Sequence, residues 1–279
     1  MEQRKHSKYM IDILMSTYNG ATFLHQQINS ILNQTYTNWR LIIRDDGSSD
    51  ATKTIIESYV LSHPDKIIIV DKNTPNLGST KSFERLLDFV ESDYFMFSDQ
   101  DDIWRSDKIE KSLSEMSHIE TLYGKNIPIM VCSDAQCIDA NGNIICLSFF
   151  DSQKFIDTTK KDIDLLALNV VQGSTALMNK RVLDYIRPFP KYVIHDQWIG
   201  VITAHYGKVS YLHEQLLLYR QHGHNVLGAL NIGTGYFIRK IANIKKQMRI
   251  YYSFYKHLPF RLNIIKWAYK KLYYSVKRL

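Results

Sequence analysis

Three aspartates lie within four positions of the stretch YFMFSDQDDIW, at Asp99, Asp101 and Asp102. The apolar run before them predicts a buried strand that ends at the first acid. Carboxylates this close repel one another and lose hydration where a buried strand ends, so another group must offset that cost. Carboxylate oxygens are ligands that Mg²⁺ and Mn²⁺ prefer, and phosphate oxygens can complete the shell. The pattern therefore favours a divalent cation site that also touches a nucleotide diphosphate.

A helix N-terminus and a calcium loop would each account for part of this acidic stretch. A helix follows it, and a helix dipole favours one or two acids at its N-terminus. The spacing of Asp99, Asp101 and Glu110 also matches positions 1, 3 and 12 of a calcium loop, but Trp104 stands where that loop needs glycine. A D-x-D pair is weak evidence by itself, and its place at the end of a parallel strand strengthens it.

Apolar strand patterns alternate with helical periodicity through the first 100 residues. The strand patterns cover residues 10–16, 39–44, 66–71 and 94–98. The helical patterns cover residues 21–34, 50–62 and 80–92. This alternation predicts an α/β fold, a mixed and mostly parallel sheet with helices on both faces. Ligands bind beyond the carboxyl ends of such strands, where this chain carries four polar loops, so we expect the site on that edge.

Later segments extend this sheet. Residues 131–148 predict a hairpin that turns at Asn141 and Gly142, which would add antiparallel strands. The next segment, 149–162, has no clear period and predicts a loop. The helix behind the acidic stretch is predicted to begin at Trp104.

The chain has no G-x-G-x-x-G after its first strand and no P-loop motif, which argues against a dehydrogenase and against an NTPase. It also lacks the glycine- and arginine-rich phosphate grip of a sugar nucleotidyltransferase. Side chains must then hold a base and ribose, and Asp45 or Asp46, just after the second strand, could accept hydrogen bonds from both. A polar turn that caps the next helix is the alternative for this DDGSSD segment.

Composition indicates a globular chain with enough apolar content, 45%, for a large core. Its three cysteines are odd in number and form no C-x-x-C pair, so we expect small core thiols in a reducing compartment. The N-terminus lacks the apolar region of a secretory signal, and no stretch reaches the roughly 18 apolar residues of a spanning helix. We therefore expect a cytosolic protein.

The net charge of +7 is unevenly distributed. Residues 236–279 carry 12 Lys and Arg and no acid, which leaves 23 basic against 28 acidic residues before them. This shift predicts a domain at 1–234 and a basic tail at 235–279. The tail has 11 aromatic residues and is split by Pro259 into two predicted amphipathic helices. An anionic membrane surface suits it better than nucleic acid, and packing on the domain is the alternative.

Six motifs resemble family 2 glycosyltransferases of the GT-A nucleotide-diphospho-sugar transferase fold, in their order and spacing across residues 10–225. They are ILMSTYNG, IIRDDGSSDAT, NLGSTKSFERLL, FMFSDQDDIWRSDKI, QGSTALMNK and HDQWIG. The forms SDQDDIW, HDQW and YRQHGHNV are most similar to the bacterial rhamnosyltransferase-type branch that builds cell-wall and capsular polysaccharides. The resemblance implies a nucleotide-sugar donor, a Mn²⁺ or Mg²⁺ ion and inversion at the anomeric carbon.

The resemblance also implies roles for residues on the four loops. Thr17 and Tyr18 match positions that pack on the nucleotide, and Asp46, with its neighbour Asp45, matches the acid that recognises the base. Asp99 matches the acid near the ribose and the metal.

Other matched residues surround the sugar and the diphosphate. Asp101 matches the direct metal ligand, and Asp102 matches a following position that shapes the sugar pocket. Arg220 matches a basic position of the branch, and His222 beside it suits the diphosphate or the metal. A solvated loop with a satisfied histidine is the alternative for His222.

Asp196 matches the catalytic base. His195 precedes it where the family commonly has glutamate, and its role is open. Asp196 would take a proton from the acceptor hydroxyl while the metal neutralises the leaving diphosphate.

We therefore expect an inverting transferase on the cytoplasmic face of a membrane. It would move a sugar, such as L-rhamnose, from a dTDP- or UDP-sugar to a polyprenyl-diphosphate-linked saccharide. A noncatalytic polyanion- or membrane-binding module is the alternative function, and the sequence leaves the oligomeric state open.

Overall fold

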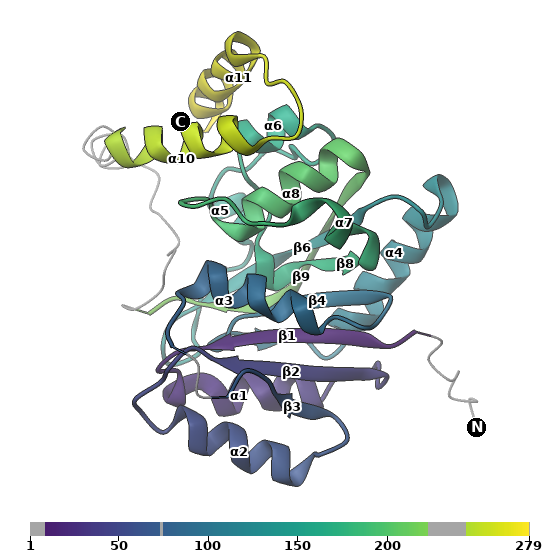
Figure 1. Ribbon diagram of the computed structural model, residues 1–279, viewed down its shortest axis with the longest axis vertical. Helices are drawn as coiled ribbons and strands as arrows, with labels where there is room; N and C mark the ends of the chain where they lie inside the picture. The colour runs from purple at the N-terminus through teal and green to yellow at the C-terminus, as the bar shows by residue number, and fades with distance from the viewer. Residues whose placement is uncertain (1–8, 73–74, 223–243, 279) are drawn as a thin grey trace.

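The computed structural model describes residues 9–72, 75–222 and 244–278. A nine-stranded sheet runs through this part of the chain in the order β3-β2-β1-β4-β8-β6-β9-β5, and β7 pairs with β6 outside that path (Figure 1). The order places the first strand in the interior of the sheet, between the second and the fourth.

The first half of the sheet is parallel, as the alternating pattern predicts. Its strands are β1 (Ile11–Thr17), β2 (Trp39–Asp45), β3 (Ile67–Ile69) and β4 (Tyr94–Ser98). The connecting helices are α1 (Ala21–Leu32), α2 (Thr52–Ser62) and α3 (Ser79–Leu86), the last followed by the short η1 (Leu87–Phe89). Since Thr17 pairs with Asp45 and Met15 with Ser98, the carboxyl ends of β1, β2 and β4 lie together.

The second half of the sheet is mixed. Its strands are β5 (Ile103–Trp104), β6 (Ile129–Ile138), β7 (Ile144–Cys146), β8 (Leu177–Asn179) and β9 (Lys208–Arg220). β8 is antiparallel to both β4 and β6, whereas the long β9 is parallel to β6. The two residues of β5 pair antiparallel with Leu217 and Leu218 near the end of β9, which brings the end of β9 beside the acidic stretch.

Helices cover both faces, because alternate residues of the central strands are buried on opposite sides. Leu14 and Phe97 belong to one apolar core, and Ile13 and Met96 belong to the other. Burial on both faces is typical of parallel strands. The remaining helices are α4 (Lys108–Tyr123), α5 (Phe149–Ser152), α6 (Asp162–Ala167), η2 (Gly173–Thr175), η3 (Lys180–Val182), α7 (Leu183–Ile186) and α8 (His195–Tyr206).

Two predictions about local structure were wrong. The helix behind the acidic stretch begins at Lys108 rather than at Trp104, because residues 103 and 104 pair with β9 as a strand. Trp104 is nonetheless buried, at 3% exposure. The predicted loop at 149–162 contains the single turn of α5, which Ser148 caps by accepting a hydrogen bond from the Asp151 N–H.

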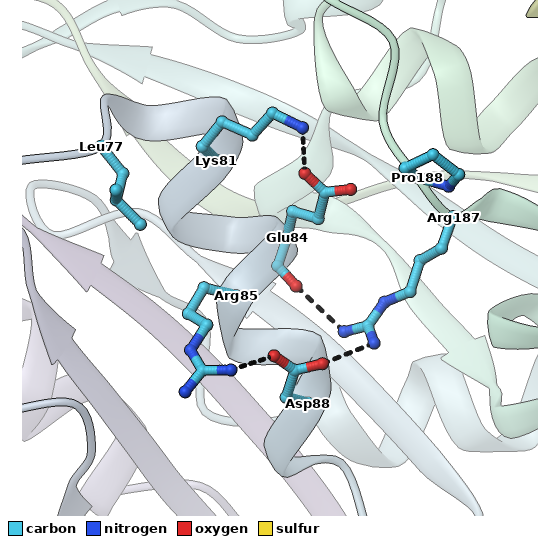
Figure 2. A pocket seen from close by; sticks show the side chains of 7 residues that line it. All are labelled: Leu77, Lys81, Glu84, Arg85, Asp88, Arg187 and Pro188. Atoms are coloured by element: carbon cyan, nitrogen blue, oxygen red, sulfur yellow. Dashed lines mark hydrogen bonds and ion pairs between the residues drawn. The ribbon is translucent and has the colours of Figure 1, made fainter.

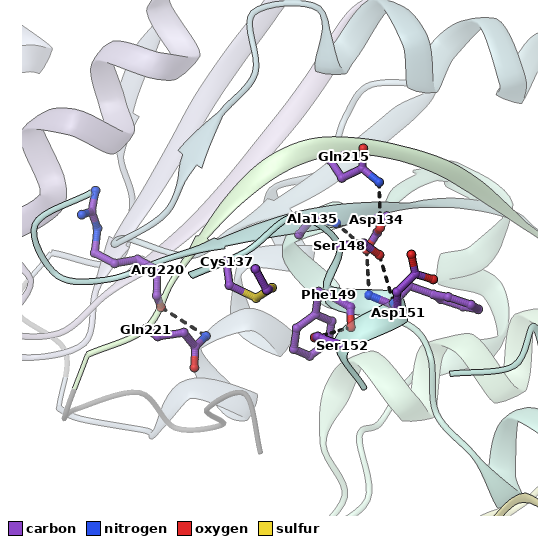
Figure 3. Close-up of a disulfide and its surroundings, with 12 residues drawn as sticks. Asp134, Ala135, Cys137, Ser148, Phe149, Asp151, Ser152, Gln215, Arg220 and Gln221 are labelled. Atoms are coloured by element: carbon purple, nitrogen blue, oxygen red, sulfur yellow. Dashed lines mark hydrogen bonds between the residues drawn. A yellow bond between two sulfur atoms is a disulfide. The ribbon is translucent and has the colours of Figure 1, made fainter. Parts of the chain in front are cut away.

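The expectation of three unpaired thiols was also wrong. Cys137 and Cys146 form a disulfide, whereas Cys132 is free and buried (Figure 3). The two cysteines face each other across the antiparallel pair of β6 and β7, and this hairpin has the predicted turn. Cysteine counting could not reveal the pair, because it depends on the strand register.

The tail forms the two predicted helices, α10 (Ile244–His257) and α11 (Ile264–Lys277), on either side of Pro259. Both lie at one end of the molecule (Figure 1), where α11 contacts α6 and α10 contacts α8. The proposed boundary between residues 234 and 235 lies outside the described residues. Among the helices of the described ranges, none has the length and apolar character needed to cross a membrane.

Asp12 is a buried anchor at the start of β1. It accepts hydrogen bonds from Arg40 Nε at 2.6 Å, Glu91 N at 2.8 Å and Ser92 N at 2.9 Å. Burial opposes its charged form, but these hydrogen bonds, with Arg40 foremost, hold the pKa of Asp12 below its usual value. Because the folded pKa is the lower one, this stabilisation is present above the unfolded pKa and is lost as pH falls through the folded pKa.

We expect Asp12→Asn to lower the free energy of unfolding by about 3 kcal/mol near neutral pH, because Arg40 loses its buried partner. The difference from the unsubstituted protein should narrow in acid, which urea denaturation at about pH 7 and about pH 3 would measure. Asp184→Asn is the matched control, since its ion pair with Arg181 is exposed. Equal losses in the two variants would contradict this account of Asp12.

Candidate active site

The loop after β1 is fastened to the loop after β4 by one side chain. Gln100 Nε2 donates to the Tyr18 carbonyl at 3.0 Å, and the Tyr18 N–H donates to Gln100 Oε1 at 2.8 Å. Gly20 leaves room for this amide, since a Cβ there would collide with it. The Tyr18 ring is 51% exposed, whereas Thr17 is buried. The loop therefore presents an aromatic face beside the acidic stretch.

The two acids after β2 are both engaged within the protein. Asp45 accepts from Thr17 Oγ1 at 3.0 Å and from the Ser48 N–H at 2.9 Å. Asp46 is buried, pairs with Arg44 at 2.5 Å and accepts from Gly78 N at 2.9 Å. Asp46 thus holds the segment that leads into α3, and its assignment to base recognition stays a prediction.

Asp99 is influenced by three neighbouring charges, those of Asp101, Asp196 and Lys108. Burial, followed by the charges of Asp101 and Asp196, raises the pKa of Asp99 to about 7, against a hydrogen bond from Ser174 and the charge of Lys108. Asp196 lies 97 positions later in the chain, so the structure brings it to the edge where β4 ends. The charge repulsion expected from the sequence is present, and it includes the acid expected to act as base.

Asp102 points into the protein. Its Oδ1 accepts the Arg220 N–H at 3.0 Å, and its Oδ2 has no hydrogen-bond partner among the described residues. Burial raises the pKa of Asp102 well above its usual value. Asp102 therefore binds the end of β9 inside the protein. Its contact with a donor sugar stays a prediction.

Arg220, at the end of β9, is buried and binds mainly backbone. Its Nε donates to the Asp101 carbonyl at 2.8 Å, its Nη2 donates to Gln26 at 2.6 Å, and its guanidinium lies 4.6 Å over the Phe23 ring. These contacts support the acidic loop that follows β4. The expected contact between Arg220 and a nucleotide stays a prediction.

His222 lies against the expected metal ligand. Its Nε2 is 2.8 Å from Asp101 Oδ2, and its ring packs 5.0 Å from Phe23. Two of the three predicted ligands, Asp101 and His222, are therefore in contact, and Asp99 is near enough to interact through charge. In the ranges that the structure describes, no group of three or more His, Cys, Asp or Glu side chains is arranged to hold a metal.

Asp196 lies in the first turn of α8. It accepts from the Gln197 N–H at 2.5 Å and from the Gly173 N–H. Burial raises the pKa of Asp196 to about 6, against these hydrogen bonds. A carboxylate with this pKa is suited to take a proton near neutral pH.

His195 is part of the apolar core. Its ring stacks 4.7 Å from Phe83 and lies edge-on to Phe97 at 5.4 Å. Burial lowers the pKa of His195 to about 4, so the imidazole is neutral. Its role, open from the sequence, is to pack the start of α8 against β4 and α3.

The η2 turn connects Asp99 with Asp196, and the sequence did not reveal this connection. The Gly173 N–H bonds to Asp196, the Ser174 side chain bonds to Asp99, and Lys108 Nζ donates to the Ser174 carbonyl. Lys108 is buried 3.6 Å over the Trp104 ring, and burial lowers its pKa to about 7, against the charges of Asp102 and Asp99. The signal available in the sequence was a lysine at a position on the apolar face of α4, one turn before the buried Ser112. It could have indicated a buried partner for Lys108.

A cavity lies beside this site, and none of the predicted site residues lines it. It measures about 560 Å³ between α3 and the segment after α7 (Figure 2). Its lining residues are Leu77, Lys81, Glu84, Arg85, Asp88, Arg187 and Pro188. Glu84 accepts the Phe189 N–H at 2.6 Å, and Asp88 pairs with Arg187 at 2.6 Å. These contacts fasten the segment that leads into α8 to α3.

The model of the glycosyl transferase family 2 matches residues 12–187, well over half of the chain. The chain belongs to this family. It is 29% identical to the dTDP-rhamnosyl transferase RfbG of Shigella flexneri, over 77% of this chain and 74% of that one. It is 34% identical to the UDP-Glc:alpha-D-GlcNAc-diphosphoundecaprenol beta-1,3-glucosyltransferase WfgD of Escherichia coli, over 70% of each. It spans only 38% of an uncharacterized glycosyltransferase of Rickettsia conorii.

Solved structures support the fold. TarS 1–349 of S. aureus in complex with UDP-GlcNAc superposes with a TM-score of 0.65 at 14% identity, covering 96% of this glycosyltransferase and 72% of that chain. The mannosyltransferase PcManGT of Pyrobaculum calidifontis, in complex with GDP-Man and Mn2+, gives 0.62 at 15% identity, covering 98% and 74%. The predicted GT-A fold and the family 2 resemblance are thus confirmed.

We expect Lys108→Met to reduce glycosyl transfer about 10- to 100-fold, because the η2 turn loses the donor that holds it between the two acids. The free energy of unfolding should stay equal or rise, because a buried charge is replaced by an apolar side chain of similar length. Steady-state rates and urea denaturation would measure these effects. Lys111→Met, one turn away and exposed, is the matched control.

Proposed function

We propose that this glycosyltransferase is inverting and metal-dependent, and that it moves a sugar from a nucleotide-sugar to a lipid-linked saccharide. The observation that carries the proposal is the meeting of Asp99, Asp101 and Asp196 at the carboxyl edge of the sheet, where the charges of the other two raise the pKa of Asp99. The edge thus provides acids both for a cation and for a proton.

Asp196 is the base in this proposal. Inversion in one step needs an acceptor hydroxyl that attacks the anomeric carbon from the face opposite the leaving diphosphate. As the new bond forms, the hydroxyl proton passes to the Asp196 carboxylate. The Gln197 and Gly173 N–H groups fix the orientation of that carboxylate. No covalent nucleophile is required.

Asp101, Asp99 and His222 are the residues that would hold Mn²⁺ or Mg²⁺. The chemistry of the donor set suits such an ion, because carboxylate oxygens and one imidazole leave coordination positions for diphosphate oxygens. Asp101 and His222 are already in contact, but the described residues do not form a preassembled group of three ligands. Bound there, the ion would supply positive charge to the leaving diphosphate. The Mn2+ in the PcManGT structure supports this assignment.

The donor in this proposal is a dTDP- or UDP-sugar, with L-rhamnose as the candidate sugar. The likeness to RfbG, named a dTDP-rhamnosyl transferase, supports this choice. UDP-GlcNAc and GDP-Man in the two solved structures support a nucleotide-sugar donor. In this proposal Tyr18, which is exposed, and the Asp45 carboxylate, which is held by Thr17, contact the nucleotide.

The acceptor in this proposal is a saccharide on a polyprenyl diphosphate, used for cell-wall or capsular polysaccharide. WfgD, whose name specifies a diphosphoundecaprenol acceptor, supports this class. Such an acceptor lies in a membrane, so we place the enzyme at the cytoplasmic face, with the tail at 235–279 against the lipid.

A panel of nucleotide-sugars, assayed with Mn²⁺, Mg²⁺ or a chelator, tests the proposal directly. We expect turnover of one dTDP- or UDP-sugar, its loss with chelator, and product of inverted anomeric configuration. Asp101→Ala should abolish both turnover and metal-dependent nucleotide binding by calorimetry. Nucleotide binding that is equally tight with and without the metal, together with no turnover, would favour the noncatalytic alternative.

The base assignment predicts the pH dependence. Because burial raises the pKa of Asp196 to about 6, kcat/KM should rise with pH through about 6 and level off above it. Asp196→Asn should reduce kcat about 1000-fold or more while nucleotide binding is kept. A flat profile between about pH 5 and 8, or activity in Asp196→Asn, would contradict the assignment.

A further inference from the structure

The tail helices α10 and α11 each have one face packed on the domain. On α10, Phe254 is buried and lies 5.8 Å from the Trp198 ring. On α11, Tyr274 is buried, and Lys270 pairs with Asp164 of α6 at 3.0 Å. The inner faces thus belong to the core of the molecule, and the alternative of packing on the domain is correct for them.

The opposite face of α11 carries an exposed apolar stripe. Ile265, Tyr269, Leu272 and Val276 are 85%, 65%, 66% and 58% exposed. Their spacings of four, three and four residues place them along a single line on the helix. This line is roughly opposite Tyr274, so the helix is apolar on two sides.

α10 repeats this arrangement. Met248, Tyr252 and Tyr255 are 66%, 67% and 53% exposed, with spacings of four and three. Basic residues follow one side of each stripe at the neighbouring helical positions. They are Lys245, Arg249 and Lys256 on α10, and Lys266 and Lys277 on α11.

This concentration of apolar surface needs a partner. Of the 21 large apolar residues that are exposed in the described part of the chain, nine lie in these two helices. Exposed apolar residues aligned on a helix face in this way mark an interaction site. We call the outer faces of α10 and α11, with the seven stripe residues and the five basic residues beside them, the outer tail surface.

Charge selects among the possible partners. Residues 236–279 hold 12 Lys and Arg and no acid, so two copies meeting through this surface would repel each other. Nucleic acid offers phosphates for the basic residues, but Ile265, Leu272 and Val276 cannot stack on bases as aromatic side chains do. An anionic lipid leaflet offers both phosphate headgroups and an apolar layer.

We infer that the outer tail surface docks on an anionic bilayer, with both helices in the plane of the interface. The stripes enter the boundary between headgroups and acyl chains, and the lysines and arginines contact lipid phosphates. Because the inner faces remain packed, docking requires neither detachment of the tail nor a spanning segment. This inference specifies how the proposed enzyme meets its membrane, and it does not rest on catalysis.

Sedimentation of the full chain with phosphatidylcholine vesicles, with and without phosphatidylglycerol, tests the inference. Ile265→Ser, Tyr269→Ser and Leu272→Ser together should lower the partition coefficient about 100-fold or more. Leu61→Ser with Leu122→Ser is the matched control, since both leucines are exposed outside the tail. Binding by this control should equal that of the unsubstituted chain.

A second variant measures the electrostatic contribution to vesicle binding separately. Lys245→Gln, Arg249→Gln and Lys256→Gln together should lower binding to phosphatidylglycerol vesicles about 100-fold. Binding to pure phosphatidylcholine should be unchanged. Circular dichroism and thermal melting would establish that each variant keeps its fold.

Three results would overturn the inference. Unchanged vesicle binding by the triple variant of Ile265, Tyr269 and Leu272, the stripe variant, would show that the apolar stripe does not contribute to docking. A change of mass by light scattering from dimer to monomer in the stripe variant would assign the surface to self-association. Tight oligonucleotide binding that is lost in the basic variant, without vesicle binding, would assign it to nucleic acid. Turnover of a soluble acceptor tests the catalytic proposal separately. If the enzyme does not turn over that acceptor, the vesicle-binding result still holds.

Discussion

Crowding of three acids at the end of β4, with Asp102 buried and Asp99 and Asp101 half-buried, is the constraint on which the rest of the site depends. Asp102 is turned inward onto the Arg220 N–H, Asp101 is held by His222, and Asp99 shares the η2 turn with Asp196. Each partner comes from a segment far away in the sequence. The protein thus keeps acids close together by surrounding them with fixed donors rather than by separating them.

The sheet supplies these donors through its order. Since β5 pairs with the end of β9, Arg220 and His222 arrive beside the acidic stretch although they lie more than 110 positions later. α4 follows β5 directly and brings the Lys108 ammonium under the acids. In this GT-A fold, strand pairing therefore fixes the relative positions of most of the site residues.

Periodicity predicted the parallel half of the sheet well, because burial on both faces produces long apolar runs that end at polar loops. β4 began and ended where expected, at Tyr94 and Ser98. What the sequence could not show depends on pairing between distant residues. The disulfide of Cys137 and Cys146 and the strand character of Trp104 arise from strand register. The buried contact of Lys108 arises because α4 approaches η2. Motif order placed Asp196 at the site, whereas the packing role of His195 needed its neighbours.

The amide of Gln100 has a consequence for substitutions in the two loops that it joins. It fills the space where a side chain on Gly20 would stand, and it bonds to both polar groups of the Tyr18 backbone. The first loop and the acidic loop therefore form one rigid unit, with an acid on either side of the fastening residue. A side chain at Gly20 would displace the Gln100 amide and leave both Tyr18 backbone groups to water, so a change in one loop reaches the other.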